Sequence, residues 1–353
     1  MKMIKIKALT ITTVCLLFLS SLIGCTNQNK EDGKRLIDCA GDEVVLPANP
    51  KRVINNVIYG GQIMVTLGLG DYLIGVNEDI AETPWLDELY PRINQITKYG
   101  EHLNAEALLS AKPDVVIVEK RNDAIELRSK GINAVVFKYY SITEFKYAID
   151  FLGKLLNETE KTDAYINYFD AKTDFVKTSL NGKIEKKRSL YYINGVSNKG
   201  LYKTIGKGST NSELAGLSYV EFATDSLISS PQNYVDSEAI IKKNPENIII
   251  GGKYQHLLYK KLYETPEWNN VSALKNDCVF TVPMGIAAWN RYGAEMALMI
   301  PWTSSVVYPE YISFDTVKEI QNFYKTFTDC EVSAEHAQYM IKGLMPNGEK
   351  EVN

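Results

Sequence analysis

The chain has 353 residues, of which 45% are hydrophobic and 23% are charged. This composition is typical of a folded globular protein and excludes a largely disordered chain, and the length predicts two lobes or domains. The formal net charge of −4 indicates no basic surface for nucleic acid. Because only three histidines occur, His102, His256 and His336, a metal site built mainly from imidazole ligands is nearly excluded.

The first residues are typical of a bacterial secretory signal. Lysines at positions 2, 5 and 7 precede an uncharged apolar run over residues 8–24, which is the charge and hydropathy pattern of such a signal. The run ends Leu22-Ile23-Gly24-Cys25, which resembles a lipobox. The resemblance implies that Cys25 is diacylated and anchors the mature chain, because two acyl chains hold a protein on a membrane stably. The alternative is an uncleaved anchor helix.

One internal repeat organises the rest of the chain. Residues 106–118 align without a gap with residues 238–250, and each copy begins Glu-Ala and has a Pro seven residues later, Pro113 or Pro245. Both copies then continue into a β-branched run. Each copy therefore predicts a short helix, stopped by Pro, that leads into a buried parallel strand. The shared spacing favours two similar α/β lobes over a chance match between two helix–strand units.

Strand-like runs alternate with helical stretches in both halves of the chain. The strands are predicted at residues 52–57, 73–76, 115–118 and 134–137 in the first half, and at 189–193, 248–250 and 279–282 in the second. This alternation predicts parallel sheets with right-handed crossovers. Between the halves, residues 142–185 contain no Pro and repeat apolar residues at helical spacing, which predicts a stiff connector of two helices or one kinked helix.

Together these patterns predict an α/β fold of two similar Rossmann-like lobes with parallel sheets, joined by a long rigid helix and separated by a ligand cleft. Residues 315–327 and 334–344 have the pattern of closing helices. The expected division is a lipoprotein signal peptide at 1–24, a lipidated tether at 25–36, an N-terminal lobe at 37–141, the connecting helix at 142–186, a C-terminal lobe at 187–312, and closing helices with a tail at 313–353.

No motif in the sequence predicts catalysis. A Gly-x-Ser-x-Gly elbow is absent, and residues 200–208 lack both the spacing and the hydroxyl residue of a phosphate-binding loop. No His or Cys spacing predicts zinc, and Cys39, Cys278 and Cys330 are expected as buried small side chains. We therefore expect a protein that is not an enzyme and has no cofactor. A surface-anchored hydrolase or lyase on the same scaffold, or a membrane-bound sensor or adhesion module, is the alternative from another class.

The combination of a lipobox, two α/β lobes and a stiff connector resembles the solute-binding lipoproteins of bacterial ABC importers, most closely the group that serves iron–siderophore, haem and corrinoid ligands. Residues 38–47 and 50–54 resemble that group's opening hairpin and first strand, and residues 67–76 its next helix end and strand. Residues 112–117 and 244–249 resemble its lobe-core strands. The resemblance covers about residues 37–327. It implies a place on the outer face of the cell membrane, with an ABC permease and its ATPase as partners and no nucleic acid.

The resemblance also implies one permease-docking carboxylate on each lobe. The family's position corresponds to Glu106, within Asn104-Ala105-Glu106, and to Glu238, seven residues before the Pro of the second strand unit. These are the two glutamates that the internal repeat superimposes. Carboxylates on both lobes would let arginines of a permease sense the lobe separation. The alternative is that each is a helix-start acid favoured by the helix dipole.

Ligand-binding side chains are expected on the loops that follow the strands, where the lobes face each other. Aromatic residues offer flat surface there, and Arg and Lys neutralise anionic groups. The candidates are Tyr59, Tyr99, Lys120, Arg121 and Tyr140 on the first lobe, and Tyr202, Lys253, Tyr254, Trp289, Arg291 and Tyr292 on the second. The run from Trp289 to Tyr292 is the most suggestive, with a packing segment at a helix start as its alternative.

The expected ligand is an iron–siderophore-type complex, haem or a corrinoid, because an organic chelate suits an aromatic and basic cleft. An oxyanion such as molybdate or tungstate is the alternative within the same importer role. A bare transition-metal ion is disfavoured, since three scattered histidines cannot form a His-rich cage.

Overall fold

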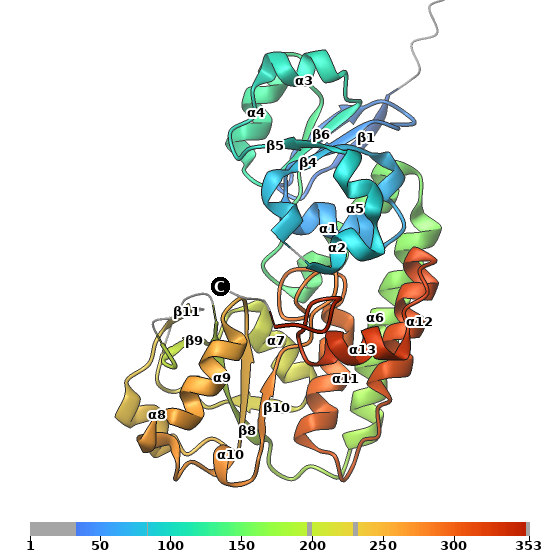
Figure 1. Cartoon of the computed structure of the whole chain (residues 1–353). Helices are drawn as coiled ribbons and strands as arrows, with labels where there is room; N and C mark the ends of the chain where they lie inside the picture. The colour runs from blue at the N-terminus through green and yellow to red at the C-terminus, as the bar shows by residue number, and fades with distance from the viewer. Residues whose placement is uncertain (1–32, 83, 196–199, 229–231, 351–353) are drawn as a thin grey trace, which may run out of the picture.

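The computed structural model describes residues 33–82, 84–195, 200–228 and 232–350. Within these residues the chain forms two α/β lobes with a layer of helices along one side (Figure 1). The predicted signal peptide, Cys25 and most of the tether lie outside the described residues. No helix of the described part is long and apolar enough to cross a membrane, and its three cysteines, Cys39, Cys278 and Cys330, are free and partly buried.

The first lobe is built on a parallel sheet of five strands in the order β5-β4-β3-β6-β7. Its central strands are buried on both faces because helices cover both sides, as the unbroken apolar run of β6 requires. An antiparallel hairpin precedes the sheet in the chain. The strands are β1 (Lys34–Ile37), β2 (Glu43–Leu46), β3 (Val53–Asn55), β4 (Leu73–Asn77), β5 (Thr97–Tyr99), β6 (Val115–Val118) and β7 (Ala134–Val136), and the helices are α1 (Ile58–Thr66), α2 (Pro84–Leu89), α3 (Ala105–Ala111), α4 (Arg121–Ser129) and α5 (Ile142–Leu156).

The second lobe has a six-stranded sheet in the order β11-β9-β8-β12-β13, with β10 also paired to β8. Strands β8, β10, β12 and β13 run parallel, whereas β9 and β11 add antiparallel pairs at one edge. The strands are β8 (Arg188–Asn194), β9 (Lys203–Ile205), β10 (Val220–Phe222), β11 (Gln232–Tyr234), β12 (Asn247–Gly251) and β13 (Val279–Thr281), and the helices are α7 (Thr210–Leu217), α8 (Ser237–Lys243), α9 (Gln255–Glu264), α10 (Ser272–Lys275) and α11 (Met296–Val307).

The internal repeat is present in the backbone of both lobes. The helices α3 and α8 begin at side-chain caps, Asn104 and Asp236, whose oxygens accept backbone N–H groups of the first turn. Both helices end at a residue in the left-handed conformation, Lys112 (φ 49°, ψ 56°) and Asn244 (φ 49°, ψ 61°). The chain then passes through Pro and enters β6 or β12. The two units therefore share their caps, turn and strand.

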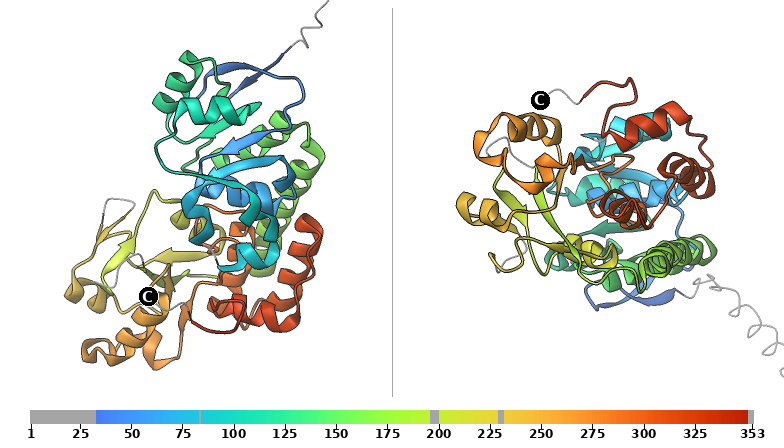
Figure 2. Two further views of the ribbon diagram at one scale, coloured as in Figure 1. Left: turned by 45° about the horizontal axis from the view of Figure 1, so that its top comes forward. Right: turned by 90° about the horizontal axis from the view of Figure 1, so that it is seen from below.

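The connecting segment consists of two helices, α5 and α6 (Thr159–Leu180), separated at Asn157 in the left-handed conformation. The helices approach closely at Gly153, where a Cβ would lie 2.0 Å from Thr162 Oγ1. Helix α6 packs against α5 and α11 on the side of the molecule away from β11 (Figures 1 and 2). One buried cluster runs from the first sheet through Phe169 of α6 to Tyr192 of β8, so the lobes share a core through this layer.

The C-terminal segment also contacts both lobes. Helices α12 (Thr316–Thr328) and α13 (Ala334–Ile341) are followed by a turn whose Leu344 carbonyl accepts a hydrogen bond from Trp85 Nε1 of α2 at 2.9 Å. The neighbouring Gly343 carbonyl lies 2.8 Å from His256 Nε2 of α9. The turn thus ties a helix of the first lobe to a helix of the second.

Candidate functional site

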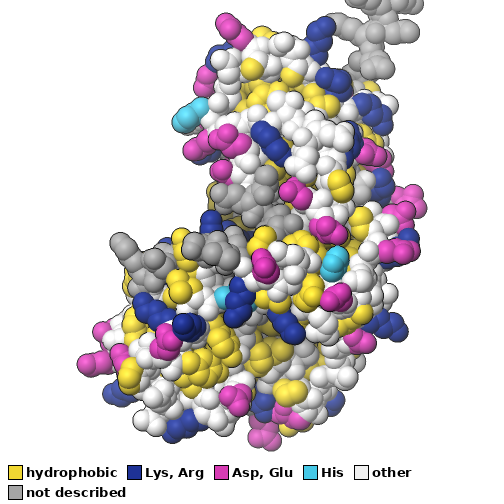
Figure 3. Space-filling view, viewed as in Figure 1, with side chains coloured by type: hydrophobic (Ala, Val, Ile, Leu, Met, Phe, Trp, Pro, Cys, Tyr) yellow, Lys and Arg dark blue, Asp and Glu magenta, His cyan; other side chains and the backbone are white. Residues whose placement is uncertain are grey.

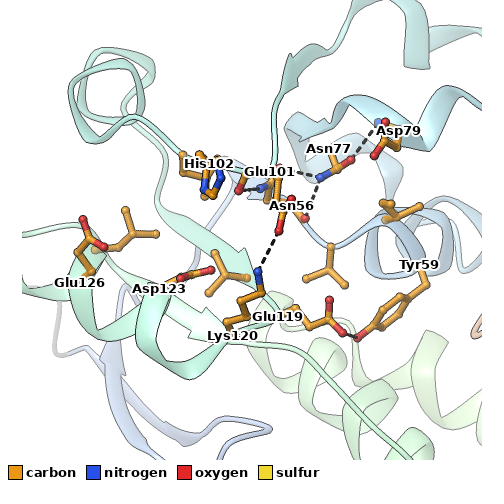
Figure 4. Close-up of a pocket in the computed structure, with 15 residues that line it drawn as sticks. Asn56, Tyr59, Asn77, Asp79, Glu101, His102, Glu119, Lys120, Asp123 and Glu126 are labelled. Carbon is orange, nitrogen blue, oxygen red and sulfur yellow. Dashed lines mark hydrogen bonds and ion pairs between the residues drawn. The ribbon is translucent and has the colours of Figure 1, made fainter.

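A cavity of about 490 Å³ opens at the carboxyl ends of β3, β4 and β6, on the edge of the first lobe that faces the second. Figure 3 shows the surface hollowed between the lobes, and Figure 4 shows the side chains that surround the cavity. In a parallel α/β sheet this edge is where ligands bind. The lining residues are Asn56, Val57, Ile58, Tyr59, Asn77, Asp79, Glu101, His102, Leu103, Val118, Glu119, Lys120, Asp123, Glu126 and Leu127.

Two asparagines at the ends of β3 and β4 shape this edge of the sheet. Asn77 is buried, its Nδ2 lies 3.4 Å from both the carbonyl and the side-chain oxygen of Asn56, and its Oδ1 accepts the Asp79 N–H at 2.9 Å. Asn56 in turn donates to the Gly100 carbonyl at 3.2 Å. These bonds connect the loops after three neighbouring strands, so the rim of the cavity is fixed by its own polar network.

The charged side chains of the cavity are predominantly acidic. Lys120 is engaged by Glu101, with Nζ 2.9 Å from Oε1, and this bond lowers the pKa of Glu101. Glu126 is paired with Lys130 outside the cavity at 2.6 Å. The remaining carboxylates, Asp79, Glu119 and Asp123, are exposed, and none of them has an ion-pair partner among the described residues. Lys120 also interacts electrostatically with Glu119 and Asp123, so among the lining residues that the structure describes the carboxylates outnumber the lysine and the cavity keeps a net negative charge.

Aromatic side chains bring the two lobes into contact beside this cavity. The ring of Tyr59, at the start of α1, lies 5.6 Å from the ring of Tyr292 of the second lobe and 5.4 Å from that of Tyr139. Tyr139 donates from its hydroxyl to the Tyr292 carbonyl at 2.6 Å. The Tyr59 hydroxyl donates to Glu119 at 3.2 Å, and burial together with that carboxylate raises the pKa of Tyr59, so it stays a protonated donor.

The segment of the second lobe that carries Tyr292 is held by a buried carboxyl group. Glu295 is fully buried, and its Oε1 accepts from the Ala287 N–H at 3.1 Å and from the Tyr324 hydroxyl at 3.0 Å. Burial raises the pKa of Glu295. Four buried polar atoms in and near this segment have no hydrogen-bond partner among the described residues: Tyr192 Oη, Trp289 Nε1, Asn290 Oδ1 and Glu295 Oε2.

The candidate residues of the first lobe lie at four different places. Tyr59 and Lys120 line the cavity, and Tyr140 is 64% exposed at the lobe junction, where its carbonyl accepts from Thr210. Arg121 points instead to the opening hairpin, where its guanidinium is bidentate with Asp42. Tyr99 lies in β5 against Gly75, where a Cβ would approach its ring to 2.4 Å.

The candidate residues of the second lobe also divide by burial. Arg291 and Tyr292 are exposed beside the junction, and Lys253 is exposed after β12. Trp289 is fully buried in the core. Tyr254 packs against the core of the second lobe. Tyr202 accepts from Trp268 Nε1 at 3.3 Å and stacks on that ring, so it forms part of the same core.

The two docking candidates occupy equivalent places. Glu106 and Glu238 are exposed in the first turns of α3 and α8. Neither has an ion-pair partner among the described residues. Both carboxylates are therefore available to a partner at the surface.

Sequence reasoning did not select the asparagines and carboxylates of the cavity, which are Asn56, Asn77, Asp79, Glu101, Glu119, Asp123 and Glu126. They are neither aromatic nor basic, which are the residue types expected for an anionic chelate. For Asn77, Asp79 and Glu119 the available signal was their position one to three residues after the strands predicted at 73–76 and 115–118. Within the described residues, no group of three His, Cys, Asp or Glu side chains is placed to hold a metal ion.

Comparisons with known proteins agree with this architecture. The sequence pattern of the periplasmic binding protein family matches residues 62–284. The ABC transporter substrate-binding lipoprotein YvrC of Bacillus subtilis is 24% identical over 293 residues, covering 80% of this chain and 86% of YvrC. YfiY of the same organism, named a probable siderophore-binding lipoprotein, is 26% identical over 43% of this chain and 47% of its own length.

A solved structure shows the same fold. The molybdate-binding protein MolA of Haemophilus influenzae, bound to molybdate, superposes with a TM-score of 0.72 over 85% of this chain and 99% of its own, at 18% sequence identity. The two-lobed α/β architecture predicted from the sequence is thus confirmed.

Proposed function

The chain belongs to the periplasmic binding protein family, and from this premise we propose that it is the extracytoplasmic solute-binding lipoprotein of an ABC importer. It captures a metal chelate of the iron–siderophore type, haem or a corrinoid, and delivers it to a membrane permease driven by an ATPase. Diacylation of Cys25 anchors it to the outer face of the cell membrane. Binding and release, without catalysis, are its whole task.

The observation that carries this proposal is the cavity of about 490 Å³ beside the aromatic contact between the lobes. The cavity lies at the strand ends where α/β proteins bind ligands, and its volume lies within the usual range for small-molecule sites. Tyr59 lines the cavity, and its ring contacts Tyr292, which adds aromatic surface of the second lobe beside the cavity. Their contact couples the cavity to the relative position of the lobes.

Relatives with similar folds bind different solutes, so the choice of solute is argued from the side chains that line the cavity. An oxyanion such as molybdate, which MolA holds, needs hydrogen-bond donors and positive charge around it. The cavity is lined by more carboxylates than cations, and its Lys120 is already paired with Glu101. Its chemistry and size therefore favour an organic chelate over a small oxyanion.

The proposal is tested by thermal melting of the full chain in detergent with ferric hydroxamates, ferric catecholates, haem, corrinoids, molybdate and tungstate. A ligand at about 100 times its dissociation constant adds roughly 2.7 kcal/mol to the stability of the folded state, which raises Tm by a few degrees. We expect a chelate or corrinoid to raise Tm. A shift with molybdate alone would contradict the chelate assignment, and turnover of any compound would replace the importer role with a hydrolase or lyase.

Glu106 and Glu238 are proposed as the permease-docking residues, one on each lobe. They superimpose in the repeat, are exposed, and start helices of the same design. We expect the double variant Glu106→Ala and Glu238→Ala to bind ligand normally but to support less uptake in vesicles that contain the permease. Glu160→Ala is the matched control, because Glu160 is also an exposed first-turn acid but lies on α6. A loss of ligand affinity in the double variant would contradict docking.

A further inference from the structure

The charged side chains that line the cavity, here called the first-lobe wall, indicate which charge the chelate carries. We propose that the ligand presents a cationic or hydrogen-bond-donating face to this wall, so that the site selects positively charged or neutral chelates over anionic ones. This inference rests on the proposed function and adds the charge of the substrate to it. It departs from the basic cleft that the sequence predicts.

The first step is that the basic candidates of the first lobe are already used by the fold. Lys120 is held by Glu101 at 2.9 Å, and Arg121 is bidentate with Asp42 on the opening hairpin. Within the described residues, neither cation is left for an anionic ligand without the loss of an existing ion pair. An anion at this wall would have to compete with a protein carboxylate for each of them.

The second step is that the cavity keeps a surplus of carboxylates. Asp79, Glu119 and Asp123 come from three different elements, the 3-10 turn after β4, the end of β6 and the first turn of α4. All three line one cavity and lack an ion-pair partner among the described residues. Their fields therefore add inside a shared concave surface, which concentrates cations and repels anions.

The inference is tested with one chelate in three charge states. A linear ferric tris-hydroxamate with a terminal primary amine carries a positive charge, its N-acetylated form is neutral, and its N-succinylated form is negative. Binding to the full chain in detergent is measured at low salt by quenching of tryptophan fluorescence. We expect the affinity to fall from the amine to the acetyl to the succinyl form, by roughly two- to fivefold at each step for each carboxylate involved.

Matched variants distinguish the effect of the cavity carboxylates on binding from the effect of carboxylates elsewhere on the surface. The triple variant Asp79→Asn, Glu119→Gln and Asp123→Asn should remove the dependence on charge. The control Asp87→Asn, Glu88→Gln and Glu160→Gln removes three exposed carboxylates that do not line the cavity, and it should retain the dependence. Added salt should weaken the dependence in the wild type.

The outcomes distinguish this inference from the function on which it rests. Equal or tighter binding of the succinyl form, or an unchanged order of affinities in the triple variant, would overturn the charge selection and leave the importer role intact. If the folded protein binds none of the three chelates, the chelate-binding function fails and the charge selection fails with it.

Discussion

The two lobes share a helix–Pro–strand unit but differ at the residue where the strand ends. Glu119 follows β6 in the first lobe, and the equivalent residue of the second lobe is Gly251 at the end of β12. Glu119 extends into the cavity and accepts a hydrogen bond from Tyr59. Gly251 leaves no room for a side chain, because a Cβ would lie 2.0 Å from Tyr192 Oη. One scaffold therefore supports an open, charged wall and a closed, packed wall.

The comparison shows which residues maintain the scaffold and which make the site. The caps Asn104 and Asp236 and the left-handed residues Lys112 and Asn244 recur in both lobes and set the path of the strands. The residues that follow the strands do not recur. Ligand chemistry in this chain is consequently a property of the strand ends, and the repeated unit supplies only their position.

The largest expected effect on stability tests the packed wall. Gly251→Ala should destabilise the fold by about 1–3 kcal/mol, because the new methyl group overlaps the buried Tyr192 hydroxyl and Val282. Glu119→Ala, at the aligned position, should change stability by no more than about 0.5 kcal/mol, since the side chain is exposed. Urea denaturation of both variants measures the difference. Equal losses would show that the two strand ends are packed alike.

A smaller effect tests the shared turn. Lys112→Gly should stabilise the fold by about 0.5–1 kcal/mol, because glycine adopts the left-handed conformation without strain from a Cβ. Asn244→Gly should instead destabilise it by about 0.5–1.5 kcal/mol, since Asn244 Oδ1 accepts the Ser272 N–H at 2.7 Å. The same denaturation assay reports both changes. Stabilisation by both glycines would mean that the hydrogen bond of Asn244 contributes nothing.

The third prediction concerns how folding stability depends on pH through the buried carboxyl group of the second lobe. Burial raises the folded-state pKa of Glu295 above its ordinary 4.5, so the unfolded chain ionises first and folding stability is lost as pH rises from about 4.5 through the folded pKa. Glu295→Gln removes this loss and keeps an oxygen for Ala287 and Tyr324. The stability gained by the variant should therefore grow with pH. A gain that is constant with pH would show that Glu295 ionises normally.

Much of the fold follows from local sequence signals. The repeat, its Pro residues and the β-branched runs predicted both lobe cores, and the absence of Pro predicted the helical connector while leaving one or two helices open. The structure has two helices, because the first helix ends at Asn157 and the two helices pack closely at Gly153. The antiparallel strands β9 and β11 are three residues each, which is too short for an alternating pattern to be recognised. The division of the chain into six parts stays a prediction.

The site was less accessible to sequence reasoning because partners distant in the chain decide which side chains face the cavity. Tyr59 and Lys120 lie at strand ends and line it. Arg121 follows directly after Lys120, yet its side chain hydrogen-bonds to Asp42 on the opening hairpin and does not line the cavity. Tyr202 pairs with Trp268, 66 residues away in sequence. Residue type and position after a strand predicted the edge of the sheet but could not predict these pairings.

The central claim is that one small molecule binds where Tyr59 and Tyr292 bring the lobes together, and its most direct test is an equilibrium titration. The full chain in detergent is titrated with the amine-bearing ferric tris-hydroxamate, alongside Tyr59→Ala with Tyr292→Ala and the control Tyr259→Ala, which truncates a partly exposed tyrosine on α9. We predict saturation at one chelate per chain, weakened in the double variant and unchanged in the control. No saturation, or equal binding by all three proteins, would contradict a ligand site between the lobes.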